Sequence, residues 1–206
     1  MEWNDRFMML FREGVERYLQ NTRLPADRFF LPEELEFMSG IGYQAAEMLG
    51  YIQEYAVMGE PSPSTTLLIA AMRRSYFIAS QRGITGNAKP VKASDLPAET
   101  EEFQEIPYLP HIIRKAEAKM YGTLDPAIMY GNEKDRRFLK DHGNIHPADF
   151  LYWVWSARGD RQKMVSAVLN AIRAAAPAGQ PGDTAPAEGA AGTAPTEPTQ
   201  TELTLD

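Results

Sequence analysis

The segment from Ser62 to Gln81 reads SPSTTLLIAAMRRSYFIASQ, and it decides the fold class. Its first residues, Ser62-Pro63-Ser64, are typical of a helix start, because a serine side chain caps unpaired amide groups and proline fits the first helical turn. The run from Leu67 to Met72 is apolar on every side of such a helix. The sequence therefore predicts a central, buried helix over residues 64–81.

Apolar residues recur at helical spacing in further segments on both sides of this helix. They predict helices over 3–20, 32–40, 45–56, 110–121, 133–142 and 146–155, and a last one that carries 164–172. No segment shows the strict alternation of a strand. We therefore expect an all-α fold, a compact bundle of about seven to eight helices.

Residues 84–107 have no clear periodicity. They contain several helix breakers: Gly86, Pro90, Pro97 and Pro107. So long a loop is uncommon in a compact domain. Three interpretations stay open: a short helical turn near 97–103, a functional loop across the surface, or a boundary between two lobes.

Charge is spread unevenly along the chain. Its 206 residues include 28 acidic and 21 basic ones, which gives a net charge of −7. After residue 175 there is no basic residue, and Ala, Pro, Gly and Thr dominate. We expect a helical domain at 1–175 and a disordered acidic tail at 176–206. The domain is close to neutral, which argues against a nucleic-acid binder.

The absence of cysteine excludes disulfides, thiolate catalysis, iron–sulfur clusters and cysteine-type zinc sites. No apolar run approaches the ~20 residues that span a bilayer. The acidic start, Met1 to Asp5, lacks the pattern of a signal peptide. We therefore expect a cytoplasmic protein that has no membrane partner and no cofactor.

Arg73 and Arg74 are unusual because they follow six apolar residues in the predicted buried helix. A buried guanidinium needs a partner, since an unpaired buried charge is strongly unfavourable. One interpretation is a structural ion pair with Asp135 or Glu47. The other is an anion pocket, because arginine binds carboxylate and phosphate groups through two parallel hydrogen bonds.

The anion-pocket hypothesis draws on a second arginine pair, Arg136 and Arg137, which we expect to face the first. The hydroxyl of Tyr130 adds a neutral donor. The candidate ligand-binding residues are therefore Arg73, Arg74, Tyr130, Asp135, Arg136 and Arg137.

The segment from Asp141 to Asp149 holds two histidines and two aspartates, which are metal-ligand types. Gly143 and Pro147 interrupt the helices there, so His142 and His146 do not share a helix face. The helix dipole explains these residues without a metal, because it favours a cation such as His142 in a last turn and an acid such as Asp149 in a first turn. We therefore predict no metal site.

Tyr152, Trp153 and Trp155 form a dense aromatic block. Neighbours two positions apart differ by about 200° around a helix, so these side chains lie on different faces. One face is expected in the core, and the other is a candidate contact surface or ligand platform. Burial in the core is the favoured interpretation.

Three motifs in the second half occur together: LPHIIRKAEAK at 109–119, DRRFL at 135–139 and IHPADFL at 145–151. With Tyr130-Gly131 they resemble the bacterial domain-of-unknown-function family 5069. The motif RRSYF at 73–77 extends the resemblance upstream. The resemblance implies a family but no activity.

The sequence lacks a nucleophile elbow, a phosphate-binding loop and a dinucleotide fingerprint. We expect a binding or interaction module whose partner is a small anionic ligand or a protein. The alternative is a small enzyme acting on an anionic substrate, with Asp135 or His142 in acid–base catalysis. A basic run could form a nucleic-acid patch, but such charges are more often a solvated helix face, so nucleic-acid binding is disfavoured. The run consists of Arg114, Lys115, Lys119, Arg136, Arg137 and Lys140.

Overall fold

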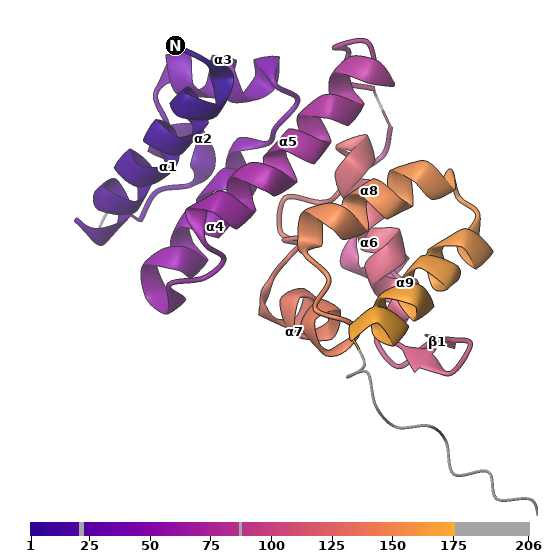
Figure 1. The fold of residues 1–206 in the computed structure, drawn as a ribbon. Coiled ribbons are helices and arrows are strands. Elements are labelled where there is room, and N and C mark those ends of the chain that lie inside the picture. Colours follow the sequence, from indigo (N-terminus) through magenta and orange to yellow (C-terminus); the bar gives the residue numbers. More distant parts are fainter. Residues whose placement is uncertain (21–22, 87, 176–206) are drawn as a thin grey trace, which may run out of the picture. The chain divides into compact units, whose positions relative to one another are not determined.

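A computed structural model describes residues 1–20, 23–86 and 88–175 (Figure 1). Within these ranges the chain forms nine α-helices: α1 (Trp3–Leu19), α2 (Ala26–Phe29), α3 (Pro32–Gly40), α4 (Ala45–Met58), α5 (Pro63–Ala79), α6 (Leu109–Tyr121), α7 (Glu133–Asp141), α8 (Pro147–Ala157) and α9 (Arg161–Ala175). The prediction of an all-α fold is confirmed. None of the described helices has the length and apolar character needed to cross a bilayer. The tail predicted at 176–206 lies outside the described residues.

The helix ends follow the residues that the sequence singles out. The Ser62 side chain accepts a hydrogen bond of 3.1 Å from the Thr65 amide at the start of α5. The Asn132 side chain accepts one of 3.0 Å from the Asp135 amide at the start of α7. Gly122 ends α6 with a φ of 71°, a left-handed conformation that glycine adopts without strain. Local capping thus sets these boundaries.

The segment 84–107 does not form the helical turn that we considered near 97–103. It contains a 3₁₀ turn (Ala93–Asp95) and a hairpin of two short strands, β1 (Glu102–Phe103) and β2 (Ile106–Pro107). The loop residues Gln104 and Glu105 both have positive φ, at 50° and 62°. Such a turn normally carries Asn-Gly or Asp-Gly, so the sequence gives no signal for it.

The helix α2 was also not predicted, because residues 21–25 read as a break followed directly by the helix at 32–40. It is a single turn of four residues. The ring of Phe29 at its end is buried and meets the ring of Phe30 edge-on, with centroids 4.9 Å apart. Burial of these rings, rather than helix propensity, stabilises this turn.

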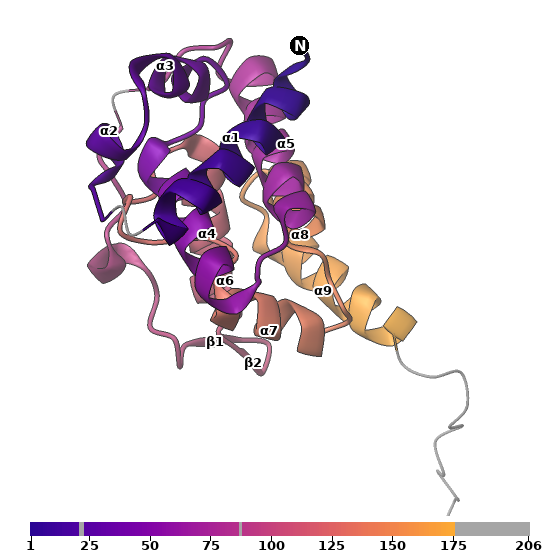
Figure 2. The same ribbon diagram turned by 90° about the vertical axis from the view of Figure 1, so that its left-hand side faces the viewer.

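The helix α5 is central in the packing, as predicted. It contacts α1 in the first half of the chain and α6 and α8 in the second half, while α1 also packs on α4 (Figures 1 and 2). Ile69 and Ala70 are fully buried, but Leu68 is 48% exposed. The helix is therefore not buried on every side, which corrects the expectation from its apolar run. Residues 1–175 belong to one compact unit.

Candidate functional site

Arg73 belongs to α5, and its guanidinium lies beside Gly122 at the C-terminal end of α6. Its side chain is 2% exposed, and its Nη1 donates a hydrogen bond of 2.7 Å to Oε1 of Gln81. Gln81 in turn donates a bond of 2.9 Å to the backbone carbonyl of Tyr121. The last carbonyl groups of a helix carry partial negative charge, so this position favours a guanidinium.

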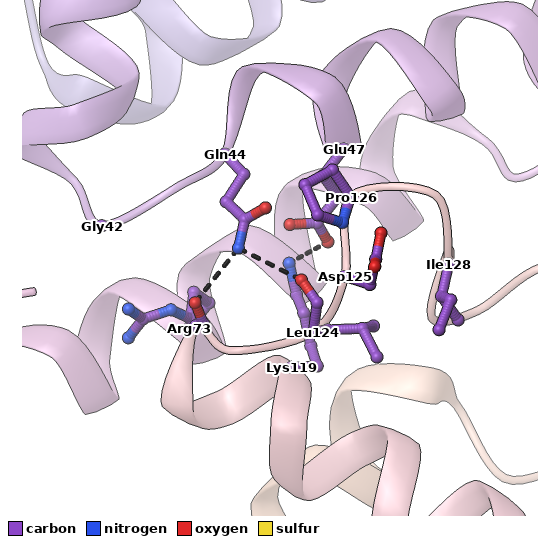
Figure 3. A pocket seen from close by; sticks show the side chains of 10 residues that line it. Gly42, Gln44, Glu47, Arg73, Lys119, Leu124, Asp125, Pro126 and Ile128 are labelled. Carbon is purple, nitrogen blue, oxygen red and sulfur yellow. Dashed lines mark hydrogen bonds and ion pairs between the residues drawn. The ribbon is translucent and has the colours of Figure 1, made fainter. Parts of the chain in front are cut away.

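Gln44, the residue before α4, binds the same end of α6. Its Nε2 donates to the carbonyl oxygens of Gly122 at 3.1 Å and Leu124 at 3.4 Å (Figure 3). Carbonyl groups beyond the helix have no helical donor and need such partners when they are buried. Side chains from two segments that are far apart in the sequence, at Gln44 and at 73–81, thus meet at the end of α6.

Lys119, in the last turn of α6, forms an ion pair with Glu47 of α4 (Figure 3). Their side chains are 2% and 12% exposed. The Lys119 ammonium also lies 4.2 Å from the centroid of the Tyr43 ring, close enough for a cation–π contact. Desolvation lowers the pKa of Lys119 and the nearby charge of Arg73 lowers it further, whereas Glu47 opposes this shift.

A small cavity lies between these groups (Figure 3). Its walls include Gln44, Glu47, Arg73, Lys119 and Asp125. The volume of about 10 Å³ leaves room for about one water molecule. Within the described chain, Nε of Arg73 has no hydrogen-bond partner. Burial lowers the pKa of Arg73, with the charge of Glu47 acting in the opposite direction.

Among the buried side chains that line this cavity, positive charges outnumber negative ones. Arg73 and Lys119 are both buried, and Glu47 is the carboxylate that pairs with one of them. The Asp125 carboxylate is partly exposed and accepts a hydrogen bond of 2.9 Å from the Ala127 amide. The cavity is therefore lined by two buried cations, by a largely buried carboxylate that pairs with Lys119, and by the partly exposed carboxylate of Asp125.

Asp135 belongs to a second buried cluster. Its Oδ2 lies 2.8 Å from Nζ of Lys115 and accepts a bond of 2.7 Å from the Gly131 amide. Its Oδ1 accepts a bond of 2.7 Å from the Tyr108 hydroxyl. Both charged side chains are almost completely buried. Three donors therefore occupy the carboxylate that was considered as an acid–base group.

Tyr130 is buried next to this cluster. Its hydroxyl donates a bond of 2.8 Å to the carbonyl of Pro147, and its own carbonyl accepts one of 2.6 Å from the Tyr51 hydroxyl. Desolvation, and then the charge of Asp135, raise the pKa of Tyr130 well above its usual value. Its hydroxyl therefore connects α8 to the segment before α7.

The remaining predicted arginines have different surroundings. Nη1 of Arg136 lies 2.8 Å from Oε1 of Glu54 and donates a bond of 2.7 Å to the carbonyl of Gly131. Arg137 is exposed. The guanidinium of Arg74 lies 4.9 Å from the centroid of a Trp3 ring. The structure thus brings Tyr130, Asp135 and Arg136 together around Gly131, and it places Arg73 with Lys119 instead.

Lys115 and Lys119 are the site residues that the sequence reasoning missed, because it assigned them to a basic run. A signal for them was present. Lys115 lies three positions after the buried Ile112, and Lys119 lies three positions after the buried Ala116, on the apolar stripe of α6. Since the structure buries both lysines, neither is available to a nucleic-acid surface.

The histidines of the segment 141–149 have local partners. Nδ1 of His142 lies 2.8 Å from the carbonyl of Phe138, and Nδ1 of His146 accepts a bond of 3.1 Å from the Ala148 amide. Within residues 1–20, 23–86 and 88–175, no three potential metal ligands of the His, Cys, Asp and Glu types come together.

Comparisons with family models, curated proteins and solved structures find no match to this chain. The resemblance to family 5069 therefore stays a prediction that rests on the motifs quoted above. The function must be inferred from the site itself.

Proposed function

We propose that this protein is a binding module that accepts a small anion between Arg73 and Lys119. The observation that carries the proposal is that two buried cations, Arg73 and Lys119, line one cavity, while the largely buried carboxylate there, Glu47, pairs with Lys119. An anion in this cavity would supply the negative charge that the buried layer lacks.

Electrostatics supports this assignment. Desolvation by burial lowers the pKa of Arg73 and the pKa of Lys119, and the charge of Glu47 offsets this shift only in part. A bound anion would act in the opposite direction on both groups. In addition, the unpaired Nε of Arg73 is a donor without an acceptor.

The dimensions restrict the ligand. A space of about 10 Å³ is at the lower limit for one water molecule, so a chloride ion, which is slightly larger, enters only when the lining side chains move outward, and a nucleotide or a sugar phosphate is excluded unless the helices separate. This proposal keeps the arginine of α5 from the original hypothesis. Lys119 takes the place of Arg136 and Arg137 as the second cationic ligand, because Arg136 already pairs with Glu54.

The test is thermal unfolding of the full chain in chloride and in gluconate at equal ionic strength, since gluconate is too bulky for the cavity. Wild-type protein is expected to be more stable in chloride. At a concentration of 100 times the dissociation constant, the gain is about 2.7 kcal/mol. Comparing the two salts within each variant removes any general loss of stability that the substitution causes.

The variant Arg73→Gln is expected to lose the difference between the salts, and Arg137→Gln, at an exposed position, is expected to keep it. Glu47→Gln removes the carboxylate that pairs with Lys119 and is expected to enlarge the difference between the salts. Equal responses to chloride and gluconate in wild-type protein would overturn the proposal, as would an unchanged response in Arg73→Gln.

A further inference from the structure

A second cavity, of about 280 Å³, lies where α5, α6 and α8 meet. We call it the aromatic pocket and define it by Tyr76, Glu117, Tyr121, Trp155 and Arg158. Among the described residues it shares no wall with the anion cavity, so it is independent of the function proposed above.

Three aromatic rings from three helices form one side of the aromatic pocket. The ring of Tyr76 is common to two contacts. Its centroid lies 5.4 Å from that of Tyr121, with the planes at 87°, and 5.6 Å from that of Trp155, with the planes at 73°. Both contacts are edge-to-face, so each ring packs on its neighbour, and all three side chains line the pocket.

A carboxylate lies beside these rings. Glu117 is on α6 one turn before Tyr121, and its Oε2 is 3.5 Å from Nη1 of Arg114. At that distance the ion pair is loose and partly exposed. The carboxylate can therefore also attract a cation that enters the pocket.

Arg158 supplies the opposite charge. It follows α8 with a φ of 50° and a ψ of 42°, a left-handed conformation that is unfavourable for most residues other than glycine and asparagine. Within the described part of the chain, its guanidinium makes neither an ion pair nor a hydrogen bond. The pocket thus presents a guanidinium that is available to an anionic group.

We infer that the aromatic pocket binds a small zwitterion that carries a methylated ammonium group and a carboxylate. The ammonium group packs against Tyr76, Tyr121 and Trp155 near Glu117. The carboxylate group pairs with Arg158, through the two parallel hydrogen bonds that arginine offers to carboxylates.

The three rings favour a methylated ammonium, and the oxygen acceptors in the lining are those of Glu117, Ser80 and the tyrosine hydroxyls. A primary ammonium needs three hydrogen-bond acceptors to replace water. Aromatic faces instead suit a weakly hydrated, methylated cation. The volume also restricts the class, because 280 Å³ is below the usual range of pockets for larger ligands.

The experiment is isothermal titration calorimetry of the full chain with three probes: trimethylglycine, which carries both groups, choline, which carries the cation, and acetate, which carries the anion. Trimethylglycine is expected to bind most tightly. Arg158→Asn keeps a residue that tolerates the left-handed conformation, so the fold is retained while the guanidinium is removed. This variant is expected to weaken trimethylglycine about tenfold and to leave choline unchanged.

Tyr121→Ala removes one aromatic wall and is expected to weaken both trimethylglycine and choline about tenfold. The matched control is Tyr152→Ala, because Tyr152 on α8 is 56% exposed, close to the 50% of Tyr121, and does not line the pocket. The inference is overturned if trimethylglycine does not bind, if Arg158→Asn weakens choline as much as trimethylglycine, or if Tyr152→Ala acts like Tyr121→Ala.

Discussion

Arg73 lies so close to Gly122 that the two residues depend on each other. A Cβ atom at position 122 would be 2.5 Å from Nη2 of Arg73 and 3.1 Å from its Cζ. Gly122 also has a φ of 71°, which ends α6 in the left-handed region. The absence of a side chain at 122 therefore allows the buried guanidinium to reach the end of the helix.

We predict that Gly122→Ala destabilises the protein by about 2 to 4 kcal/mol, because it adds left-handed strain and a steric clash with Arg73. Equilibrium unfolding in urea measures the loss. Gly59→Ala is the matched control, since Gly59 has a φ of 73° but no atom within 4 Å of its Cβ position. Its loss is expected to be about 1 kcal/mol, from strain alone. Equal losses in the two variants would show that the contact with Arg73 has no effect.

The second prediction concerns the buried pair of Lys115 and Asp135. Asp135→Asn leaves the Lys115 ammonium without its carboxylate in the interior. The expected loss in the free energy of unfolding is about 3 to 5 kcal/mol. Adding Lys115→Met removes the stranded charge, so the double variant is expected to be more stable than Asp135→Asn alone. A double variant that is less stable would contradict this account.

The exposed pair of Lys134 and Glu99 provides a contrast to the buried one. Their side chains are 46% and 54% exposed. Lys134 lowers the pKa of Glu99 through a hydrogen bond, but water screens the attraction. Glu99→Gln is therefore expected to change the free energy of unfolding by less than about 1 kcal/mol in the same urea experiment. A loss as large as that in Asp135→Asn would mean that burial does not decide the strength of these pairs.

Local signals in the sequence were sufficient for the helices other than α2. Ser62, Asn132 and Gly122 mark helix ends through hydrogen bonds within a few residues. The hairpin loop at Gln104 and Glu105 was missed, because neither residue is typical of a turn with positive φ.

The site was less predictable because its contacts are long-range. Burial of Arg73 could be expected from the apolar residues before it. Its surroundings could not, since it is held by Gln81 at the end of α6 rather than by a carboxylate. Lys119 was placed in a basic run because charge alone does not show which face of a helix packs. Its spacing from Ile112 and Ala116 would have indicated burial.

The last prediction concerns alkaline pH and the hydroxyl of Tyr130. Burial raises its pKa in the folded protein well above the value of about 10 in an unfolded chain. As the pH rises, the unfolded chain therefore loses this proton first. The stability that the protonated hydroxyl contributes is complete below about pH 10 and declines above it, by up to about 1.4 kcal/mol per pH unit. Tyr43 and Tyr51, whose pKa values burial also raises, act in the same direction.

Tyr130→Phe is expected to lose about 1 kcal/mol at neutral pH, because the hydrogen bond to Pro147 is removed. Above about pH 10 its free energy of unfolding should fall less steeply with pH than that of the wild type. The difference between the two slopes is the contribution of one tyrosine proton. The lowered pKa of Lys119 has the opposite effect on stability. The folded protein loses the Lys119 proton at a lower pH than the unfolded chain does, so the free energy of unfolding rises with pH up to the pKa of lysine in the unfolded chain. Lys119 is present in both proteins, so the difference between them isolates Tyr130.

Urea unfolding at about pH 8 and about pH 11 measures both slopes, since these values lie on either side of the ordinary tyrosine pKa. Tyr152→Phe, which alters an exposed ring of α8, is the matched control for the loss of a hydroxyl group. Equal slopes for wild-type protein and Tyr130→Phe would mean that the Tyr130 hydroxyl reaches water before the protein unfolds. In that case the bond to Pro147 would open locally at high pH, and α8 would separate from the segment before α7 ahead of global unfolding.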